Sequence, residues 1–299
     1  MRDRSRDGRA HALGVLLVLA SAVAFSLAGV MTKMVATDSW TVLCWRGLFS
    51  IPPIVIYVVW RDRTKPLGAI FHLGWRGWTL ATLGSLCSAA FIAAFKLTYV
   101  ANVAVAYATV PFAAAALAWL ALRETVRAST LLAAIGAFAG VVIMVSGGMG
   151  TGHLAGDLLA VLMTLGMAVY MVLIRVFRDT PVVLALAASS LQVFLAGWFL
   201  TDPLAVSAGD LVTLALFGLI FAFAAILLTE GTRLIPAAEA GLLGTAETPI
   251  APLLAWLVLA EIPPPATFVG GGIVLAVVLA HALRDLATPA AKRQGASSR

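Results

Sequence analysis

The residue whose type and position most strongly suggest chemistry is Glu247, an acid inside the apolar run 237–259. A helix rises about 1.5 Å per residue, so a helix over this run would carry Glu247 roughly 15 Å along its axis, near mid-membrane. A carboxyl group at that depth costs several kcal/mol unless it faces a cavity, is protonated or is paired. We therefore predict that Glu247 binds a substrate amine or carries a coupling proton. The alternative is a protonated carboxyl that forms a hydrogen bond between helices.

Prolines interrupt this run and a second run, 102–122, at matching depths. Pro111 and Pro249 lie one position apart when the two runs are aligned, and Pro252 follows. Proline lacks a backbone N–H and so leaves the carbonyl four residues earlier unbonded. The carbonyls concerned are those of Tyr107, Thr245 and Thr248. Interrupted helices at corresponding positions mark transport sites, so we predict hinges at these three prolines, although a plain kink is the alternative.

Arg46 is a cation about two turns into the apolar run 40–60. Its planar guanidinium could hold a substrate carboxylate. It could also snorkel past Trp40 to the headgroups or form a structural ion pair, and the sequence favours these two possibilities. For the charged residues nearer the ends of the runs, Lys33, Lys96 and Glu230, anchoring at the membrane interface is expected.

The remaining candidates for a binding site are aromatic rings and one amide within or beside the apolar runs. They are Phe95, Tyr99, Tyr107, Tyr170 and Gln192. Rings with polar tips suit a mostly apolar pocket that recognises an organic solute through few hydrogen bonds, but each of them could equally serve packing. Tyr107 is the strongest candidate because it lies beside Pro111 and offers both a side chain and a carbonyl.

Motifs for enzymes are absent from the sequence. It has no His-Glu-x-x-His, no P-loop, no Gly-x-Ser-x-Gly and no cysteine pair at the spacing of metal ligands. The cysteines, Cys44 and Cys87, lie within apolar runs, where thiols behave as small hydrophobes. No catalytic residue, cofactor or metal is therefore predicted. The alternative class is a membrane-embedded enzyme or lipid-handling protein that uses Glu247 as an acid.

The amino-acid composition indicates that this chain lies in a membrane rather than in water. Of its 299 residues 62% are hydrophobic and 11% charged, with a mean hydropathy of +1.01, whereas soluble domains carry about 25% charged residues. Apolar runs of about 20 residues can cross a bilayer as helices, and the absence of period-2 alternation argues against a membrane barrel. We predict an all-α integral membrane protein with spans at 11–35, 40–60, 75–95, 102–122, 129–146, 154–176, 182–200, 211–229, 237–259 and 266–283.

Basic residues predict the orientation, because Lys and Arg favour cytoplasmic loops. With the N-terminus inside, every Lys and Arg except Lys33, Arg46 and Lys96 falls on the inner side. Both termini are thus expected in the cytoplasm, as an arm at 1–10 and a disordered tail at 285–299, in a bacterial-type inner membrane. The net charge of +6 is then explained by topology and by membrane lipid rather than by nucleic acid.

A repeat divides the chain into two halves. Segment 96–124 aligns without a gap on segment 233–261, pairing Lys96 with Arg233 and Trp119 with Trp256, and a second alignment pairs Gly14 with Gly156. Each half, 11–147 and 153–284, contains five spans, so the second half enters the membrane from the opposite side. Inverted repeats place a site at their interface near mid-membrane and open it alternately to each side. A central cavity is therefore predicted.

These features resemble the EamA-type branch of the drug/metabolite transporter superfamily, over nearly the whole chain. The resemblance rests on the five-plus-five arrangement, the basic residue followed by Leu, the mid-helix proline and the closing Ala-Trp-Leu before Glu124 and Glu261. It implies a basket-like monomer that exports amino acids, other metabolites or drugs. The ten spans and Trp-rich helices are similar to amino-acid exporters of the YddG type. The family's Glu-Pro is altered to Glu247-Thr248-Pro249, and the first half has no acid there.

Residues and resemblance together predict a secondary transporter that exports small organic solutes, or facilitates their diffusion, by alternating access. Amino acids are the favoured substrates, with drugs or other metabolites as the alternative. Because the two halves are covalently joined, a monomer suffices to form the pathway. The coupling of transport to protons, or to the solute gradient alone, stays open.

Overall fold

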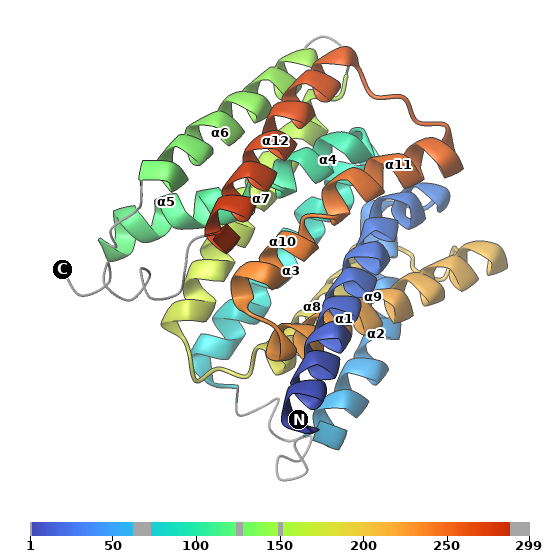
Figure 1. Cartoon of the computed structure of the whole chain (residues 1–299). Coiled ribbons are helices and arrows are strands. Elements are labelled where there is room, and N and C mark those ends of the chain that lie inside the picture. Colours follow the sequence, from blue (N-terminus) through green and yellow to red (C-terminus); the bar gives the residue numbers. More distant parts are fainter. Residues whose placement is uncertain (1, 62–72, 124–127, 149–151, 288–299) are drawn as a thin grey trace.

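The computed structural model describes residues 2–61, 73–123, 128–148 and 152–287, and every regular element among them is an α-helix. In chain order the helices are α1 (Arg2–Met34), α2 (Ser39–Arg61), α3 (Gly74–Leu97), α4 (Val100–Tyr107), α5 (Val110–Leu122), α6 (Ala128–Gly148), α7 (Leu154–Val176), α8 (Val182–Leu200), α9 (Ala208–Leu234), α10 (Ala237–Gly244), α11 (Glu247–Leu259) and α12 (Pro265–Ala287). In the described part, α4 with α5 and α10 with α11 form two broken spans, giving 10 stretches long and apolar enough to cross a membrane. The all-α prediction with ten spans is confirmed (Figure 1).

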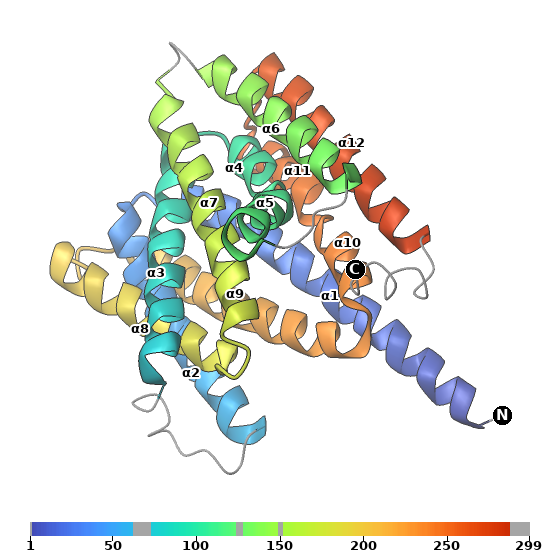
Figure 2. The ribbon, with the colours of Figure 1, turned by 90° about the vertical axis from the view of Figure 1, so that its left-hand side faces the viewer.

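Helix ends differ from the predicted runs mainly at the two termini. Helix α1 begins at Arg2 rather than at residue 11, so the predicted arm 1–10 continues the first span as helix, and its first turns project beyond the other helices (Figure 2). Arginine is a good helix former and favours this extension. Helix α12 likewise continues to Ala287, three residues into the predicted tail. The rest of that tail, 288–299, lies outside the described residues.

Capping side chains determine where two helices begin. At the start of α2, Asp38 accepts hydrogen bonds from the backbone N–H groups of Trp40 at 2.8 Å and Thr41 at 3.2 Å. At the start of α9, Ser207 Oγ accepts from the N–H of Asp210 at 3.0 Å. Burial alone raises the pKa of Asp38, but the hydrogen bonds from Thr41 and Trp40 lower it overall. An ionised carboxylate therefore caps α2, as is favourable at a helix N-terminus.

The two broken spans have the same backbone at equivalent positions. Helices α4 and α10 begin at Val100 and Ala237, and α5 and α11 end at Leu122 and Leu259. The breaks between the short helices lie at 108–109 and 245–246, so all three pairs are related by one constant shift along the chain. The left-handed residues that end α5 and α11, Arg123 (φ 53°) and Ala260 (φ 51°), obey the same shift. The sequence repeat is thus a repeat of structure.

Equivalent helices of the two halves pack against each other in antiparallel pairs. In the α2–α8 pair, an ideal Cβ on Gly47 would lie 2.6 Å from the Ser190 carbonyl oxygen, and one on Gly197 would lie 2.5 Å from that of Trp40. As α2 advances, α8 therefore returns. Helices α6 and α12 run side by side in the same manner (Figures 1 and 2), with Gly140 against Gly270. Antiparallel contact between equivalent helices requires a two-fold axis across the bundle, so the inversion of the halves is confirmed.

Close helix contacts at two glycines repeat in the same way. Gly14 of α1 lies against the end of α9, where an added Cβ would be 2.7 Å from Leu234 Cβ. Gly156 of α7 lies against the end of α3, where an added Cβ would be 2.7 Å from the backbone of Leu97. Leu234 and Leu97 are themselves equivalent. Gly14 and Gly156, which the sequence alignment pairs, therefore also make equivalent helix contacts in the structure.

The helices end at two faces, which we name by their connections. The N-terminal face carries the start of α1 and the connections 177–181 and 235–236. The far face carries the connections 35–38, 98–99, 201–207 and 260–264. Consecutive spans therefore run in opposite directions between these two faces.

We expect Gly156→Ala to destabilise the protein, because its Cβ meets backbone rather than a movable side chain. Such overpacking costs about 1–3 kcal/mol, and it should appear as a lower midpoint of thermal unfolding in detergent. Gly272→Ala in α12 is the control, since an added Cβ there meets nothing within 4 Å. Equal midpoints for the two variants would contradict the predicted contact.

Candidate functional site

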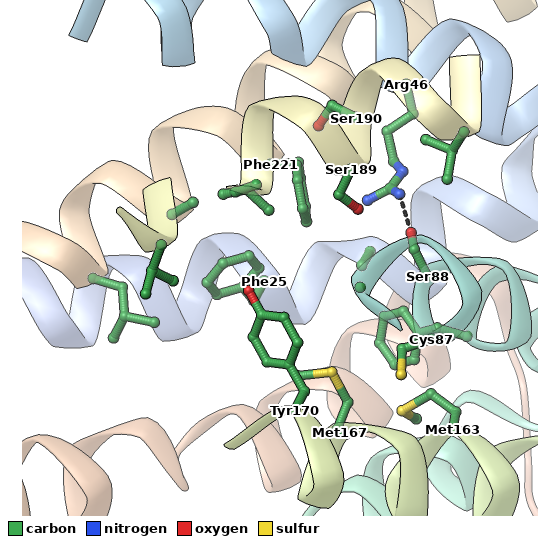
Figure 3. Close-up of a pocket in the computed structure, with 18 of the residues that line it drawn as sticks. Phe25, Arg46, Cys87, Ser88, Met163, Met167, Tyr170, Ser189, Ser190 and Phe221 are labelled. Carbon is green, nitrogen blue, oxygen red and sulfur yellow. Dashed lines mark hydrogen bonds between the residues drawn. The ribbon is translucent and has the colours of Figure 1, made fainter. Parts of the chain in front are cut away.

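A cavity of about 320 Å³ lies between the two halves. Both halves contribute to its wall, which is mainly aromatic, aliphatic and thioether (Figure 3). Its lining residues include Phe25, Phe91, Met163, Met167, Phe217 and Phe221. A pocket with apolar walls and a few polar groups is typical of a site for small organic ligands, and the predicted central cavity is therefore present.

Glu247 lines this cavity at the point where its span is broken. It is the first residue of α11, so its carboxyl group lies at the positive end of that helix. In the described part of the chain the carboxyl has no hydrogen bond and no ion pair. The alternative prediction, a carboxyl hydrogen-bonded between helices, is therefore not what this structure shows.

The breaks lie just before the prolines rather than at them. Pro111 and Pro249 occupy the first turns of α5 and α11, where the missing N–H has no helical partner to lose. Pro252 lies within α11, which continues past it, so the predicted third break is wrong. The Thr245 carbonyl, predicted to be unbonded, accepts from the Thr248 N–H at 3.1 Å. Any hinge in these spans is thus placed at 108–109 and 245–246.

Arg46 is buried in the cavity wall, 5% exposed, and does not snorkel to the interface. One of its terminal nitrogens donates a hydrogen bond to Ser88 Oγ of α3 (Figure 3). The carbon of its guanidinium lies 4.4 Å from the ring centre of Phe221 and 5.6 Å from that of Phe217. The preference for snorkelling or an ion pair was wrong because helix rotation turns this face of α2 toward the cavity.

The structure separates the other predicted site residues into three groups. Tyr107 and Tyr170 line the main cavity. Phe95 and Thr248 line a side pocket of about 10 Å³ that Glu247 shares, a volume that suits about one water molecule. The residues that line neither are Tyr99, Gln192 and Thr245.

The residues outside the cavity have structural partners. Gln192 Oε1 accepts from Ser85 Oγ at 2.6 Å and its amide donates to Thr82 at 3.1 Å, which joins α8 to α3. The Tyr99 ring packs on the His153 ring with centres 4.6 Å apart. The Thr245 hydroxyl donates to the Leu242 carbonyl at 2.6 Å. These contacts stabilise helices and turns. None of the three side chains lines the main cavity.

Several cavity residues were not predicted from the sequence. On α3 the lining positions are Gly84, Cys87, Ser88 and Phe91, and on α7 they include Met163, Met167 and Tyr170. Both sets follow the three- and four-residue spacing of one helix face. The spacing was present in the sequence, but every apolar span offers several such faces, and only the neighbouring helices select one of them.

The far face is closed by a charged contact between distant segments. Lys33 Nζ lies 2.5 Å from Glu261 Oε2, and Glu261 Oε1 accepts from the Val100 N–H at 2.5 Å. One carboxylate thus joins the end of α1 to the first turn of α4. Interface anchoring, expected for Lys33, is replaced by this ion pair. Glu124, the repeat mate of Glu261, lies outside the described residues.

A buried polar cluster lies beside this contact. Asp157 Oδ1 accepts from Thr98 Oγ1 at 2.6 Å and from Asn102 Nδ2 at 2.7 Å, and Thr267 donates to Asn102 Oδ1 at 2.6 Å. All four side chains are buried, and they join the connection after α3 to α4, α7 and α12. The cavity instead reaches toward the N-terminal face, where Val182 begins α8. The structure is therefore closed at the far face.

The fold and the cavity define a polytopic membrane protein built of two inverted halves around a solute-sized space. Residues 12–146, which span the first half, match the family model described as "EamA-like transporter family". This match confirms the predicted resemblance to EamA-type proteins for that half.

Solved structures support the same fold. Fourteen solved chains match this sequence and structure. One of them, titled "Crystal structure of protein", has a TM-score of 0.62 and 17% identity, and the match covers 92% of this chain and 97% of that chain. At this identity the likeness shows the fold alone. A comparison with curated proteins gave no match.

Glu261→Gln is expected to loosen the far face, because it removes the ionised partner of Lys33. Hydrogen bonds to charged groups contribute about 1.5–3 kcal/mol, enough to shift a closed population measurably. Spin labels at exposed Met34 and Ile262, 55% and 69% exposed, should report a longer and broader distance. Glu230→Gln, which breaks an ion pair with Arg61 nearer the N-terminal face, should leave this distance unchanged. An unaltered distance in Glu261→Gln would argue against the far-face contact.

Proposed function

We propose that this protein is a secondary transporter of small organic solutes that works by alternating access, with amino acids as the favoured substrates. The observation that carries the proposal is the cavity between two inverted halves, bounded by helices that break beside it. Two related halves can exchange conformations and so expose one site to each side in turn. The match of residues 12–146 to the EamA-like transporter family supports transport as the activity.

The closed far face supports the same mechanism. Alternating access requires that one face be closed while the other admits solute. The Lys33–Glu261 contact and the Asp157 cluster close one face, while the lining residues Leu228 and Thr229 continue the cavity toward the other. This conformation is the one that takes up solute from the N-terminal face.

Orientation gives the direction of transport. We propose, from the distribution of Lys and Arg, that the N-terminal face is cytoplasmic in a bacterial-type inner membrane. Uptake from that face and release at the far face amount to export. The cavity lies within one chain, so a monomer completes the pathway without a second copy.

Amino acids are favoured because the cavity wall carries both a cation and an acid. Glu247 and Arg46 line the same cavity as aromatic and thioether side chains. A zwitterion with an apolar side chain complements such a wall. The finer likeness to YddG-type exporters is part of this proposal, and drugs or other metabolites are the alternative cargo.

Flux in liposomes tests the proposal directly. The purified chain should move labelled amino acids down their gradients, and a protein-free control should not. Absence of flux over a broad panel of amino acids, metabolites and cationic drugs would overturn the proposal. It would leave the membrane-enzyme interpretation of Glu247 as the one to test next.

Glu247→Gln tests the role of the carboxyl. If Glu247 carries a coupling proton, the variant should lose the pH dependence of flux and keep downhill exchange, because an amide cannot release a proton. If Glu247 binds the substrate amine instead, the variant should raise KM for amine-bearing solutes. Glu230→Gln is the control, since Glu230 is paired with Arg61 outside the cavity. A variant with the wild-type pH response and wild-type KM would exclude both roles.

A further inference from the structure

Arg46 has more hydrogen-bond donors than partners. A guanidinium offers five N–H groups, and in the described part of the chain Ser88 is the one acceptor that Arg46 contacts. Its Nε is buried without any partner. No carboxylate among the described residues lies within ion-pair distance of it. A cation buried in this manner is unfavourable unless an anion completes it.

The surroundings hold the guanidinium in the wall of the cavity. Ser88 fixes one terminal nitrogen, and the Phe221 and Phe217 rings lie 4.4 Å and 5.6 Å from the guanidinium carbon. The ring contacts stabilise a cation without using any N–H donor. Figure 3 shows the side chain directed into the cavity between Ser88 and Ser189. The unused donors of the terminal nitrogens are therefore presented to an occupant of the cavity in a fixed geometry, while Nε is buried behind them.

The charges on the wall indicate which anion fits. Arg46 is a single cation, whereas Glu247 on α11 contributes an acid to the same cavity. Arg46 would balance only one of the two negative charges of a group such as phosphate. The other charge would remain unbalanced in a cavity that also contains the acid Glu247. A carboxylate carries one charge and matches the planar fork of the guanidinium in two parallel hydrogen bonds. The rest of the wall is mainly apolar.

We propose that Arg46, positioned by Ser88, is the carboxylate-binding group of the cavity, and that its ligands are organic monocarboxylates with an apolar body. The inference rests on the proposed transport function only for the fate of the ligand. Binding itself is a property of this cavity. Amino acids satisfy the requirement, and so do carboxylates without an amine, whereas cationic drugs do not.

Binding of two isosteric probes tests the inference. 3-Phenylpropionate and 3-phenylpropanamide differ only in the carboxylate, and because neither has an amine, neither can form an ammonium ion pair with Glu247. Calorimetry on the full chain in nanodiscs should show the carboxylate bound about tenfold or more tightly than the amide. Arg46→Met should remove this preference. Arg46→Lys, which keeps the charge and loses the fork, should retain part of it.

Matched controls separate binding from folding. Lys96→Met also removes one partly buried cation, but Lys96 bonds the Val35 carbonyl at 2.5 Å and lies outside the cavity, so it should keep the wild-type preference. Arg46→Met should unfold at the same temperature as the wild type or higher, because it removes an incompletely paired buried charge. A lower unfolding temperature together with unchanged probe selectivity would make Arg46 a structural residue and overturn the inference.

The outcomes distinguish this inference from the transport proposal. Equal binding of the two probes to the wild type, or no binding of the carboxylate, overturns the carboxylate site even if liposomes show flux. Selective binding that Arg46→Met removes supports the site even if no solute crosses the liposome membrane, in which case the transport proposal fails alone.

Discussion

A backbone group without a hydrogen-bond partner is expensive in hydrocarbon, and this constraint organises the molecule. A helix can stop inside a membrane only where protein or a cavity surrounds its ends. The breaks at 108–109 and 245–246 occur beside Tyr107 and Glu247, both of which line the cavity. The space between the halves tolerates the breaks, and the breaks deliver a tyrosine and an acid to that space. The broken helices and the central cavity therefore depend on each other.

Much of the fold followed from the sequence because it depends on local properties. Span length and the scarcity of charge gave ten crossings, and the gap-free alignment of 96–124 on 233–261 gave the inversion. These quantities are read from the residues of each segment alone, without knowing how the segments contact one another. Even the pairing of Gly14 with Gly156 proved to be a pairing of helix contacts.

The site followed less well because it depends on how helices are rotated. Depth along a helix can be counted, so Glu247 was expected near mid-membrane, and it lies near the middle of the span Glu239–Leu259. The direction in which a side chain points cannot be derived from its position in the sequence. Arg46 was therefore wrongly expected to snorkel to the headgroups or to form an ion pair. Gln192 lies beside the lining residue Val193 yet bonds Ser85 instead of facing the cavity. The backbone at Pro252 was also not predictable from the sequence, because a proline breaks a helix only where its surroundings permit, and α11 continues through Pro252.

The antiparallel contact of α6 with α12 has a consequence for assembly. Gly140 and Gly270 approach each other reciprocally, as identical surfaces do in a symmetric dimer. Here the two surfaces belong to one polypeptide, so their association is intramolecular and is governed by an effective concentration set by the linking chain. Two separate halves with the same contact would dissociate as lipid diluted them. In this chain the contact is intramolecular, so dilution in the membrane does not separate α6 from α12.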